Sequence, residues 1–311
     1  MSLNRTDLAD FTCFMAIARH LNFRRAALEM GVTASALSHA MTALEARRRV
    51  RLLNRTTRSV TLTAAGEALY ATLVGPFESL QQASETLNRF RDAPMGRIRL
   101  NVPGDAATLL LAPVMPVYVE RYPGIEVEIS VNNHLIDVIG SGFDAGIRYG
   151  GTVPEDMIAQ RLSPDIKWIA AAAPAYIARF GMPETPEALQ THRCINIRLG
   201  NEQLYQWEFE RNDQTIAVTT PGPLTIDESH ASISLALGGA GIIYGAEPVL
   251  RPYLEGGTLQ PVLEGWASMG AGFHIYYSGR RHIPTGLRLL IDLIREIQPL
   301  RSYPSGSAHR F

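Results

Sequence analysis

The sequence predicts an α/β protein that begins with a small all-helical domain. Apolar residues recur with the period of a helix through the first 50 residues. A long, near-heptad apolar stripe then runs from Thr63 to about Phe90. Beyond Gly96 short apolar strands alternate with helices, which is typical of parallel α/β layers. We therefore expect a helical domain at 1–62, a linker helix at 63–92, an α/β part at 93–300 and a loose tail at 301–311.

Length and composition fit a globular protein of two or three domains. The chain has 311 residues, of which 46% are apolar and 19% charged, whereas disordered chains are poorer in apolar residues. Its two cysteines lie far apart in sequence, and Cys13, beside Phe14 on a helical face, is expected to be a buried thiol. The chain begins without a signal-peptide pattern and has no apolar run long enough to span a bilayer, so we expect a cytoplasmic protein.

Positive charge is concentrated at the start of the chain. Residues 1–62 hold ten arginines against four acidic residues, a net charge of +6, and the whole-chain value of −1 leaves −7 for the rest. Six of these arginines fall within residues 47–58, with no acid between them. Such a density repels itself unless it faces solvent or a polyanion. The asymmetry indicates that only the first domain meets nucleic acid.

Three short helices are predicted within residues 1–62. The first covers Asp7–Ala18, and the second opens at Asn22. Gly31 then interrupts the apolar spacing and can adopt the positive φ of a tight turn. Thr33 is expected to cap a third helix from about Ala34 to Arg47. The second and third helices form a helix-turn-helix motif, although any two packed core helices show the same spacing.

The third helix carries short polar groups on the face opposite its apolar residues, and such groups are suited to reading base edges in a DNA major groove. Two short strands around the polar stretch NRTTRS follow it. These strands would form a wing that places Arg55 and Arg58 beside the DNA backbone or minor groove. The polar face consists of Ser35, Ser38, His39 and Thr42.

The apolar stripe after residue 62 predicts one long helix, which Thr63 caps. Pro76 is expected to kink it or to mark a stagger in the stripe. A helix this long cannot bury its stripe against a small domain. A partner helix from a second subunit would cover it and make a dimer, and the alternative is a contact with the α/β part of the same chain.

Strands in the α/β part are expected at Ile98–Val102, Ile125–Val131, Ala145–Ile147, Trp168–Ala171, Cys194–Ile197, Trp207–Glu210, Ala217–Thr220, Ile242–Tyr244 and Phe273–Tyr277. Helices are expected at Ala107–Tyr122, bent near its prolines, and at Leu135–Ser141, Ser229–Leu237 and Thr285–Ile297.

Together these features resemble the LysR-type transcriptional regulators over nearly the whole chain. The segment FTCFMAIARHLNFRRAALEMGVTASALSHAMTALE is similar to the family's winged helix-turn-helix, and RLLNRTTRSVTLTAAGEAL to its wing and dimerising linker helix. RYPGIEVEI, GFDAGIRYG and AAAPAYIARFGMPETPEALQTHRCI are similar to its effector-binding region. The resemblance implies a bacterial homo-oligomer, usually a tetramer built from dimers. Its C-terminal part would be two α/β lobes, like those of a periplasmic binding protein, with a small-molecule effector in the cleft.

By this resemblance, each head of a dimer would read one half of an inverted repeat in double-stranded DNA. The polar face of the third helix would lie in the major groove, and RNA polymerase is a further candidate partner. Phosphate or minor-groove contacts would come from Arg24, Arg25, Thr33, Arg55 and Arg58.

One departure from the family concerns Arg48 and Arg49, which stand where the family usually has Leu-Gly at the end of the recognition helix. The glycine adopts a left-handed conformation that costs another residue about 1 kcal/mol, and the leucine would be part of the core. We therefore expect strain at this helix end, and a gain in melting temperature if Leu-Gly is restored.

The effector cleft is expected at the carboxyl ends of strands, where the amides of following helices are free. Arg148 would clamp a carboxylate there, or form an ion pair with Asp144 or Asp105. Asp105 and Asp227 stand at helix starts and could be caps, and an acid at position 105 would disfavour an anionic effector nearby. The candidates are Pro103, Gly104, Asp105, Asn132, Asn133, Arg148, Arg198, Asp227 and Ser229.

An enzyme is the main alternative class. Asp227, Ser229 and His230 supply the residue types of a catalytic triad, but on one helix they point in different directions. The chain has no G-x-S-x-G, no Walker loop and no metal-ligand spacing, so no enzymatic activity, metal or cofactor is expected. A freestanding binding protein would lack the basic head. The sequence thus favours a DNA-binding regulator.

Overall fold

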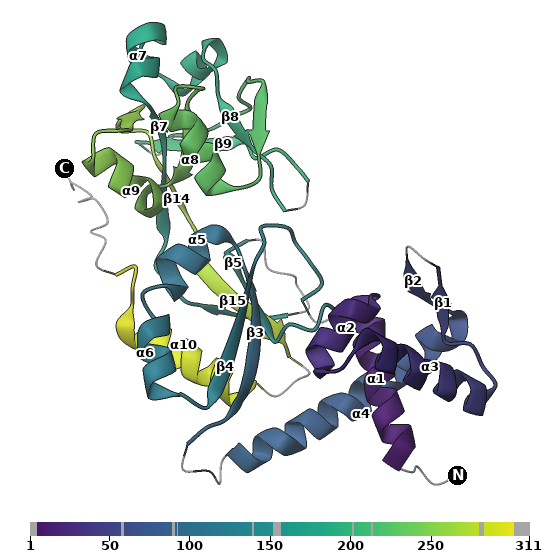
Figure 1. Ribbon diagram of the computed structural model, residues 1–311. Helices are drawn as coiled ribbons and strands as arrows, with labels where there is room; N and C mark the ends of the chain where they lie inside the picture. The colour runs from purple at the N-terminus through teal and green to yellow at the C-terminus, as the bar shows by residue number, and fades with distance from the viewer. Residues whose placement is uncertain are drawn as a thin grey trace. The chain divides into compact units, whose positions relative to one another are not determined.

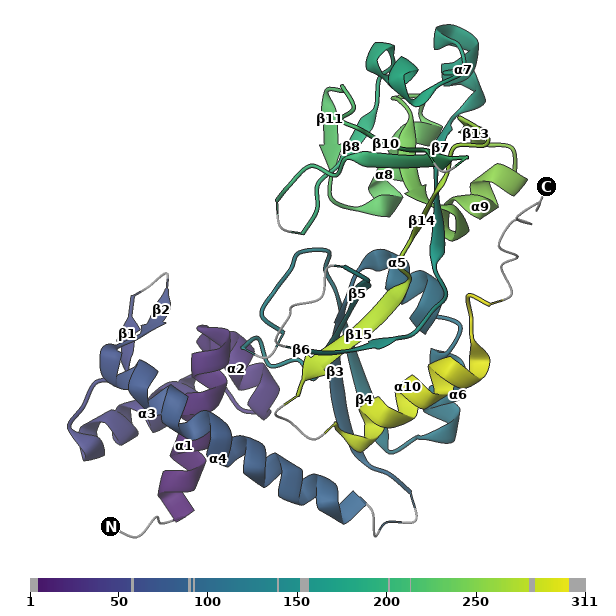
Figure 2. The ribbon, with the colours of Figure 1, turned by 180° about the vertical axis from the view of Figure 1, so that it is seen from behind.

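The computed structural model describes residues 5–56, 59–88, 91, 93–138, 140–151, 157–200, 202–212, 214–279 and 283–301. Arg58 and the expected loose tail from residue 302 onward lie outside this part. The chain divides into two compact units, residues 1–92 with 140–142, and the remaining residues. Figures 1 and 2 show the helices and strands of each unit.

The first unit opens with the three predicted helices, α1 (Arg5–His20), α2 (Phe23–Met30) and α3 (Ala34–Arg48). Their apolar faces share one core, in which Phe14, Leu37 and Met41 are fully buried. Gly31 follows α2 with the predicted positive φ of 64°. The hydroxyl of Thr33 caps α3 by accepting a bond from the Ala36 amide at 3.1 Å. The helix-turn-helix prediction is therefore confirmed.

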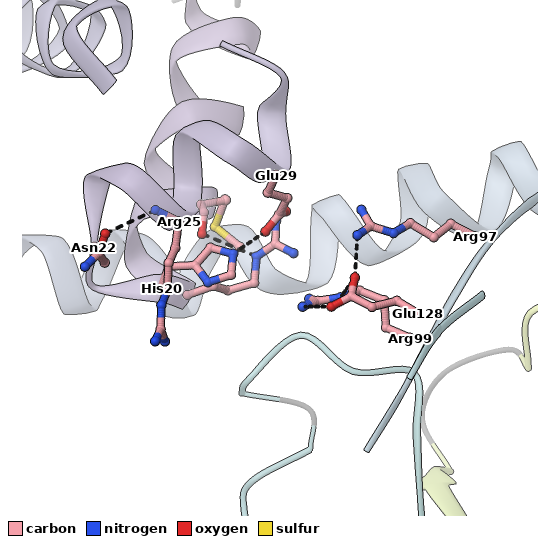
Figure 3. Close-up of polar contacts among 9 residues, drawn as sticks. His20, Asn22, Arg25, Glu29, Arg97, Arg99 and Glu128 are labelled. Atoms are coloured by element: carbon pink, nitrogen blue, oxygen red, sulfur yellow. Dashed lines mark hydrogen bonds and ion pairs between the residues drawn. The ribbon is translucent and has the colours of Figure 1, made fainter. Parts of the chain in front are cut away.

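Two further polar contacts of the first unit lie at the junction of α1 and α2. The Asn22 side chain caps α2 by accepting bonds from the amides of Arg24 and Arg25, at 2.9 and 3.1 Å. The Glu29 carboxylate pairs with His20 of α1 at 2.5 Å and with Arg19 at 3.0 Å (Figure 3). The Glu29 pairs thus link α2 to α1, whereas the Asn22 bonds hold the start of α2.

The wing has the predicted form, with β1 (Leu53–Arg55) antiparallel to β2 (Val60–Leu62). The long helix α4 (Ala64–Asn88) follows without a break at Pro76, and Thr63 caps it through the Gly66 amide at 3.0 Å. The first half of its stripe packs on the core of the first unit through residues such as Leu73 and Phe77. The expectation that a small domain cannot cover this helix is therefore wrong for that half. Farther along, Leu80 and Leu87 are 52% and 57% exposed.

The second unit consists of two lobes. In the first lobe a five-stranded sheet has the order β4-β3-β5-β15-β6, in which β3 is parallel to β4 and β5, and β15 is antiparallel to its neighbours. Helices α6 and α10 pack on the same core as this sheet, and the Tyr118 hydroxyl of α6 donates to the Gly286 carbonyl of α10 at 2.8 Å. The strands are β3 (Gly96–Val102), β4 (Ile125–Val131), β5 (Ala145–Tyr149), β6 (Met157–Arg161) and β15 (Phe273–Ser278); the helices are α5 (Gly104–Ala106), a π-turn (Ala107–Leu111), α6 (Met115–Arg121) and α10 (Thr285–Ile297).

The side chains on two neighbouring strands of this sheet are also paired by charge. Glu128 of β4 accepts bonds from Arg97 and Arg99 of β3, the latter at 3.0 Å (Figure 3). These pairs hold β3 and β4 in register on the face that carries Arg99.

The second lobe is built on β7 (Ile166–Ala172), which pairs antiparallel with β12, β13 and β14. A short parallel pair, β8 and β11, and a hairpin, β9 and β10, complete it. The remaining bounds are α7 (Pro174–Phe180), a 3₁₀ turn (Pro186–Thr191), β8 (Ile195–Ile197), β9 (Trp207–Arg211), β10 (Gln214–Val218), β11 (Leu224–Ile226), α8 (Ser229–Leu237), β12 (Ile243–Ala246), α9 (Glu247–Glu255), β13 (Gln260–Val262) and β14 (Ser268–Gly270).

Most predicted elements are present, but three corrections are needed. The helix expected at Leu135–Ser141 is wrong: the described residues there have no helical structure, and the Leu135 amide bonds to the Gly200 carbonyl at 3.2 Å. The second strand of the hairpin is 214–218, earlier than predicted, because the turn falls at Asn212, whose φ is 48°. The sequence patterns also did not predict β6, β11, β13, β14, α7 and α9.

Two simpler expectations concern cysteines and membrane spans. Cys194 is buried and Cys13 only half-buried, and burial raises the pKa of both thiols. In the described ranges no helix has the length and apolar content that crossing a bilayer requires.

Arg48 and Arg49 behave differently from each other at the end of α3. Arg49 takes the left-handed conformation of the family's glycine, with φ 53° and ψ 35°. Arg48 replaces the core leucine by an ion pair with Asp7 of α1 at 2.7 Å and lies over the Phe11 ring at 6.0 Å. Only Arg49 therefore has a strained backbone conformation, and replacement by glycine would relieve that strain.

Arg49→Gly should stabilise the first unit by about 1 kcal/mol, because glycine has no steric penalty at positive φ. Arg48→Leu should give no gain, since it removes the ion pair to the nearly buried Asp7. Hydrogen exchange of the α1 and α3 amides in the full chain measures both effects. Tryptophan fluorescence would not, because all three tryptophans lie in the second unit. Faster exchange in Arg49→Gly would contradict this account.

Candidate functional site

The first candidate site is the outer face of α3. Ser35, His39 and Thr42 are exposed on it, and Ser38 is half-buried. Arg24 and Arg25 are exposed at the start of α2. These are six of the nine residues predicted to contact DNA. The structure thus leaves a polar face and two cations accessible on the helix-turn-helix.

Arg55 of the wing contacts this face of α3. Its guanidinium donates to the Thr42 hydroxyl at 3.2 Å and to the Ser38 hydroxyl at 3.4 Å, and it pairs with Glu45 at 2.8 Å. It also lies over the Phe23 ring at 5.2 Å. From the sequence, Arg55 was expected only as an anchor beside the DNA. In the structure it also orients two of the side chains predicted to read bases.

Glu45 was not among the functional residues predicted from the sequence. One of its carboxylate oxygens accepts bonds from the amides of Leu52 and Leu53, at 2.8 and 3.0 Å, and the other pairs with Arg55. This one side chain therefore holds the start of the wing against α3. Its only signal in the sequence was a lone acid just before an arginine-rich run.

The arginine run is divided between internal pairs and exposed groups. Arg47 pairs with the buried Asp10 of α1, and Arg48 pairs with Asp7. Thr33 is a helix cap as well as a predicted phosphate contact. Arg47 and Arg48 therefore attach the end of α3 to α1, a role that the arginine run alone did not predict.

The second candidate site is a cavity of about 450 Å³ in the second unit, with walls from both lobes. It lies where β3, β5, β8 and β11 end, as predicted for the cleft. Seven of the nine predicted effector residues line it: Pro103, Asp105, Asn133, Arg148, Arg198, Asp227 and Ser229. Gly104 and Asn132 do not line it and instead shape the loops around it. The Gly104 amide donates to Asn133 at 3.2 Å, and Asn132 accepts a bond from the His134 amide at 2.9 Å.

Aromatic and branched side chains form most of the remaining wall, which sequence reasoning did not assign to the site. Tyr149, Trp168 and Tyr244 lie in a row, with ring centroids 5.1 Å apart for the first two and 5.9 Å for the last two. Ile226, Ile233 and Val249 also line the cavity. Within their own strands and helices these residues have the pattern of ordinary core, so only the fold brings them together.

Arg148 is 4% exposed and makes neither of the ion pairs that were considered for it. Its terminal nitrogens donate to four oxygens: the Ile147 carbonyl at 2.7 Å, the His134 carbonyl at 2.9 Å, the Asn101 carbonyl at 3.1 Å and the Asn101 side chain. Among the described residues its Nε has no partner. Burial lowers the pKa of this guanidinium. Arg148 thus has no terminal nitrogen free to clamp a carboxylate.

Asp105 is the buried acid of the site. Its Oδ2 accepts bonds from the Tyr149 hydroxyl at 2.7 Å and from the Ser229 hydroxyl at 3.2 Å, while Oδ1 has no partner in the described part of the chain. Burial raises the pKa of this carboxyl above its ordinary value. Asp105 and Asp227 are not helix caps. Glu228 caps α8 by accepting bonds from the His230 and Ala231 amides, at 3.0 and 2.8 Å.

The loop after β4 joins the two lobes beside the cavity. The Asn133 side chain donates to the Asp227 carbonyl at 2.5 Å, and His134 lies 3.5 Å from Glu202 and 3.7 Å from Asp227. Gly200 has room for this loop only because it lacks a Cβ, which would lie 2.5 Å from the Asn133 carbonyl. Across residues 5–301, apart from the gaps given above, no cluster of three metal-ligating side chains occurs.

Comparison with known proteins gives relatives over nearly the full length. Residues 8–67 match the family described as bacterial regulatory helix-turn-helix protein, lysR family, and residues 91–298 match the LysR substrate binding domain. The chain is 37% identical over 298 residues to the uncharacterized HTH-type transcriptional regulator YcaN of Escherichia coli K12, covering 96% of this chain and 98% of that relative. It is 32% identical over 294 residues to the HTH-type transcriptional regulator PgrR of the same organism, covering 94% and 98%.

Solved structures give the same result. The virulence activator AphB of Vibrio cholerae, at full length, is 25% identical with a TM-score of 0.67, covering 94% of this chain and 99% of that one. CrgA of Neisseria meningitidis is 25% identical with a TM-score of 0.58, covering 95% and 99%. The similarity therefore includes both the helix-turn-helix and the α/β lobes.

Asp105→Asn should stabilise the protein at about pH 7, and the gain should shrink as the pH falls toward about 4. A carboxyl whose pKa is raised by folding destabilises the fold as the pH rises through its ordinary pKa. Asparagine cannot ionise, yet it keeps an acceptor for Tyr149 and Ser229. Urea unfolding across this pH range measures the difference. The exposed Asp292 on α10 gives the control Asp292→Asn, and an Asp105→Asn effect that does not change with pH would argue against this explanation.

Proposed function

Because the chain belongs to the LysR family of transcriptional regulators, which bind DNA and respond to small-molecule effectors, we propose how its own residues perform these two tasks. The exposed face of α3 reads bases in the major groove of DNA, and the inter-lobe cavity holds the effector. Individual residues then divide between base reading, phosphate anchoring and effector binding.

The DNA-reading proposal is supported by the contrast between α3 and the residues around it. Ser35, His39 and Thr42 are exposed, whereas the nearby arginines Arg47, Arg48 and Arg55 form ion pairs within the first unit. Short polar groups on an exposed recognition helix can reach base edges, whereas exposed cations such as Arg24 and Arg25 contact phosphates without regard to sequence. We assign base reading to the first group and anchoring to the second. Arg55 serves both, because it contacts Ser38 and Thr42.

LysR-type regulators form oligomers, and we propose that this chain dimerises through the outer half of α4. The exposed Leu80 and Leu87 of that half are spaced as in a helical seam. Two heads in such a dimer would read an inverted repeat, and pairs of dimers would form a tetramer. The residues 63–92 would then be the linker and 93–300 the effector domain. This assembly would act on DNA in the bacterial cytoplasm, where RNA polymerase would be a candidate partner.

The effector proposal is supported by a single observation, the cavity lined from both lobes at the carboxyl ends of four strands. Its volume of about 450 Å³ suits a small metabolite. A molecule bound there contacts both lobes at once. It would therefore favour one arrangement of the lobes over another, which is what a regulatory ligand must do.

Arg24→Ala should weaken binding to every DNA sequence by a similar factor and reduce the slope of log K against log salt by about 0.9 for each phosphate that the arginine neutralises. Ser35→Ala should leave the slope unchanged and alter the preferred bases. Salt-dependent binding to selected and random duplexes measures both. Arg288→Ala, an exposed arginine on α10, is the matched control. If Arg24→Ala and Ser35→Ala change the slope alike, the division between anchoring and reading is incorrect.

Ile226→Trp should fill the cavity and abolish stabilisation by effector, whereas Thr225→Trp, exposed on the same strand, should not. A ligand at about 100 times its Kd stabilises a folded protein by about 2.7 kcal/mol. Thermal-shift screening of the full chain and both variants against small metabolites reveals such ligands. Hits that stabilise all three proteins equally would place the effector elsewhere.

A further inference from the structure

Asp105 is the buried acid in the wall of the cavity. Asp105 is 6% exposed, and none of the ion pairs among the described residues includes it. One of its oxygens has two hydroxyl donors and the other has none. A buried carboxylate without a counterion is costly. The raised pKa of Asp105 is the expected consequence of this environment.

Among the described residues, the hydrogen bonds of the two cavity arginines go to groups other than Asp105. The terminal nitrogens of Arg148 bind four carbonyl or amide oxygens, so its charge is already surrounded by dipoles of the protein. Arg198 donates to the Glu202 carbonyl at 2.8 Å. An anionic ligand would therefore find the terminal nitrogens of Arg148 already bonded, and only the remaining nitrogens of Arg198 could bind it.

Two more carboxylates line the cavity beside Asp105. Asp227 and Glu228 contribute to the wall from the second lobe. The Glu228 charge is partly offset by the α8 amides that it caps, its carboxylate lies 3.1 Å from His230, and that of Asp227 lies 3.7 Å from His134. The lining thus holds three acids against the two arginines Arg148 and Arg198, a formal charge of −1 that favours a cation over an anion.

The remaining wall favours an apolar body. Tyr149, Trp168 and Tyr244 present aromatic rings, and branched aliphatic side chains complete the lining. Aromatic faces also stabilise a cation within about 6 Å of the ring centre. The wall thus suits a molecule that combines an apolar part with a positively charged end.

Resting on the effector role proposed above, we propose that the effector is an amine, with a protonated nitrogen bound by Asp105 and an aromatic or branched aliphatic body against the Tyr149, Trp168 and Tyr244 wall. The ammonium supplies the counterion and the hydrogen-bond donor that the carboxylate lacks. This assignment goes against the carboxylate clamp considered for Arg148.

Matched pairs of probes test the assignment on the full-length protein. Each pair shares an apolar body and differs in charge: 2-phenylethylamine with 3-phenylpropionate, tryptamine with indole-3-propionate, and isoamylamine with 4-methylpentanoate. We expect the amines to raise the melting temperature and the carboxylates to leave it unchanged. Asp105→Asn should weaken amine binding by about tenfold or more, since it removes a hydrogen bond between charged groups. Each shift is referred to the same protein without ligand, because Asp105→Asn changes the baseline stability.

Asp292→Asn, which removes one exposed charge, should keep the wild-type response to the amines. Carboxylates that bind as well as their amine partners, amine binding unaffected by Asp105→Asn, or a panel with no binder would each overturn the amine assignment. Ile226→Trp separates this failure from that of the cavity itself. If carboxylates bind wild type but not Ile226→Trp, the cavity remains the effector site and only the amine assignment fails. If bound probes stabilise Ile226→Trp as much as wild type, the cavity is not the site.

Discussion

The effector-binding part depends on the way in which the buried Arg148 is satisfied. From β5 its guanidinium reaches Asn101 of the neighbouring β3 and the His134 carbonyl in the loop after β4. One side chain thus joins three adjacent segments of the sheet at the edge where the cavity lies. A buried charge is tolerated when dipoles replace its hydration, and four oxygens do so here. Because His134 is held in this way, Asn133 beside it can reach the Asp227 carbonyl in the other lobe. The shape of the cavity therefore depends on the bonds of Arg148 within the protein, which form without an effector.

In the first unit an acid, Glu45, joins separate segments in a similar way. Glu45 accepts two amides at the start of the wing and binds Arg55, and Arg55 in turn contacts Ser38 and Thr42. The wing and the reading face of α3 are consequently one connected polar network. Removing Glu45 would leave two amides and a guanidinium without their acceptor, so its effect would extend from the wing to the residues assigned to base reading. The paired arginines Arg47 and Arg48 have a different role, since they attach the end of α3 to α1.

Local patterns predicted what local physics determines. The helix periodicity, the Thr33 cap and the turn at Gly31 depend on a few adjacent residues, and all are present. The expectation that the cleft lies at the carboxyl ends of strands also identified nine candidates, of which seven line one cavity. Predictions failed where distant groups decide the outcome. Leu135–Ser141 has the spacing of a helix, but the backbone at its start bonds to Arg148 and to Gly200 instead of forming a helical turn. The arginine run also gave no sign that Arg47 and Arg48 pair with Asp10 and Asp7, which lie more than 35 residues earlier. The aromatic wall could not be predicted, because its members come from separate strands.

An acid at the centre of the cavity has a consequence for regulation. Asp105 belongs to the first lobe, yet its Oδ2 accepts a bond from Ser229 of the second lobe, and Asp227 of that lobe is bound by Asn133 of the first. The groups that would bind an amine are therefore also the groups that connect the lobes. A ligand shifts a conformational equilibrium only as far as it binds one state better than another. A cation at Asp105 would satisfy this condition, because it reaches its full set of acceptors only when Asp227 and Glu228 stand close by. The charge of the ligand and the positions of the lobes are then coupled through the carboxylates of Asp105, Asp227 and Glu228. An apolar molecule without the charge would fill the cavity but would not draw these carboxylates together.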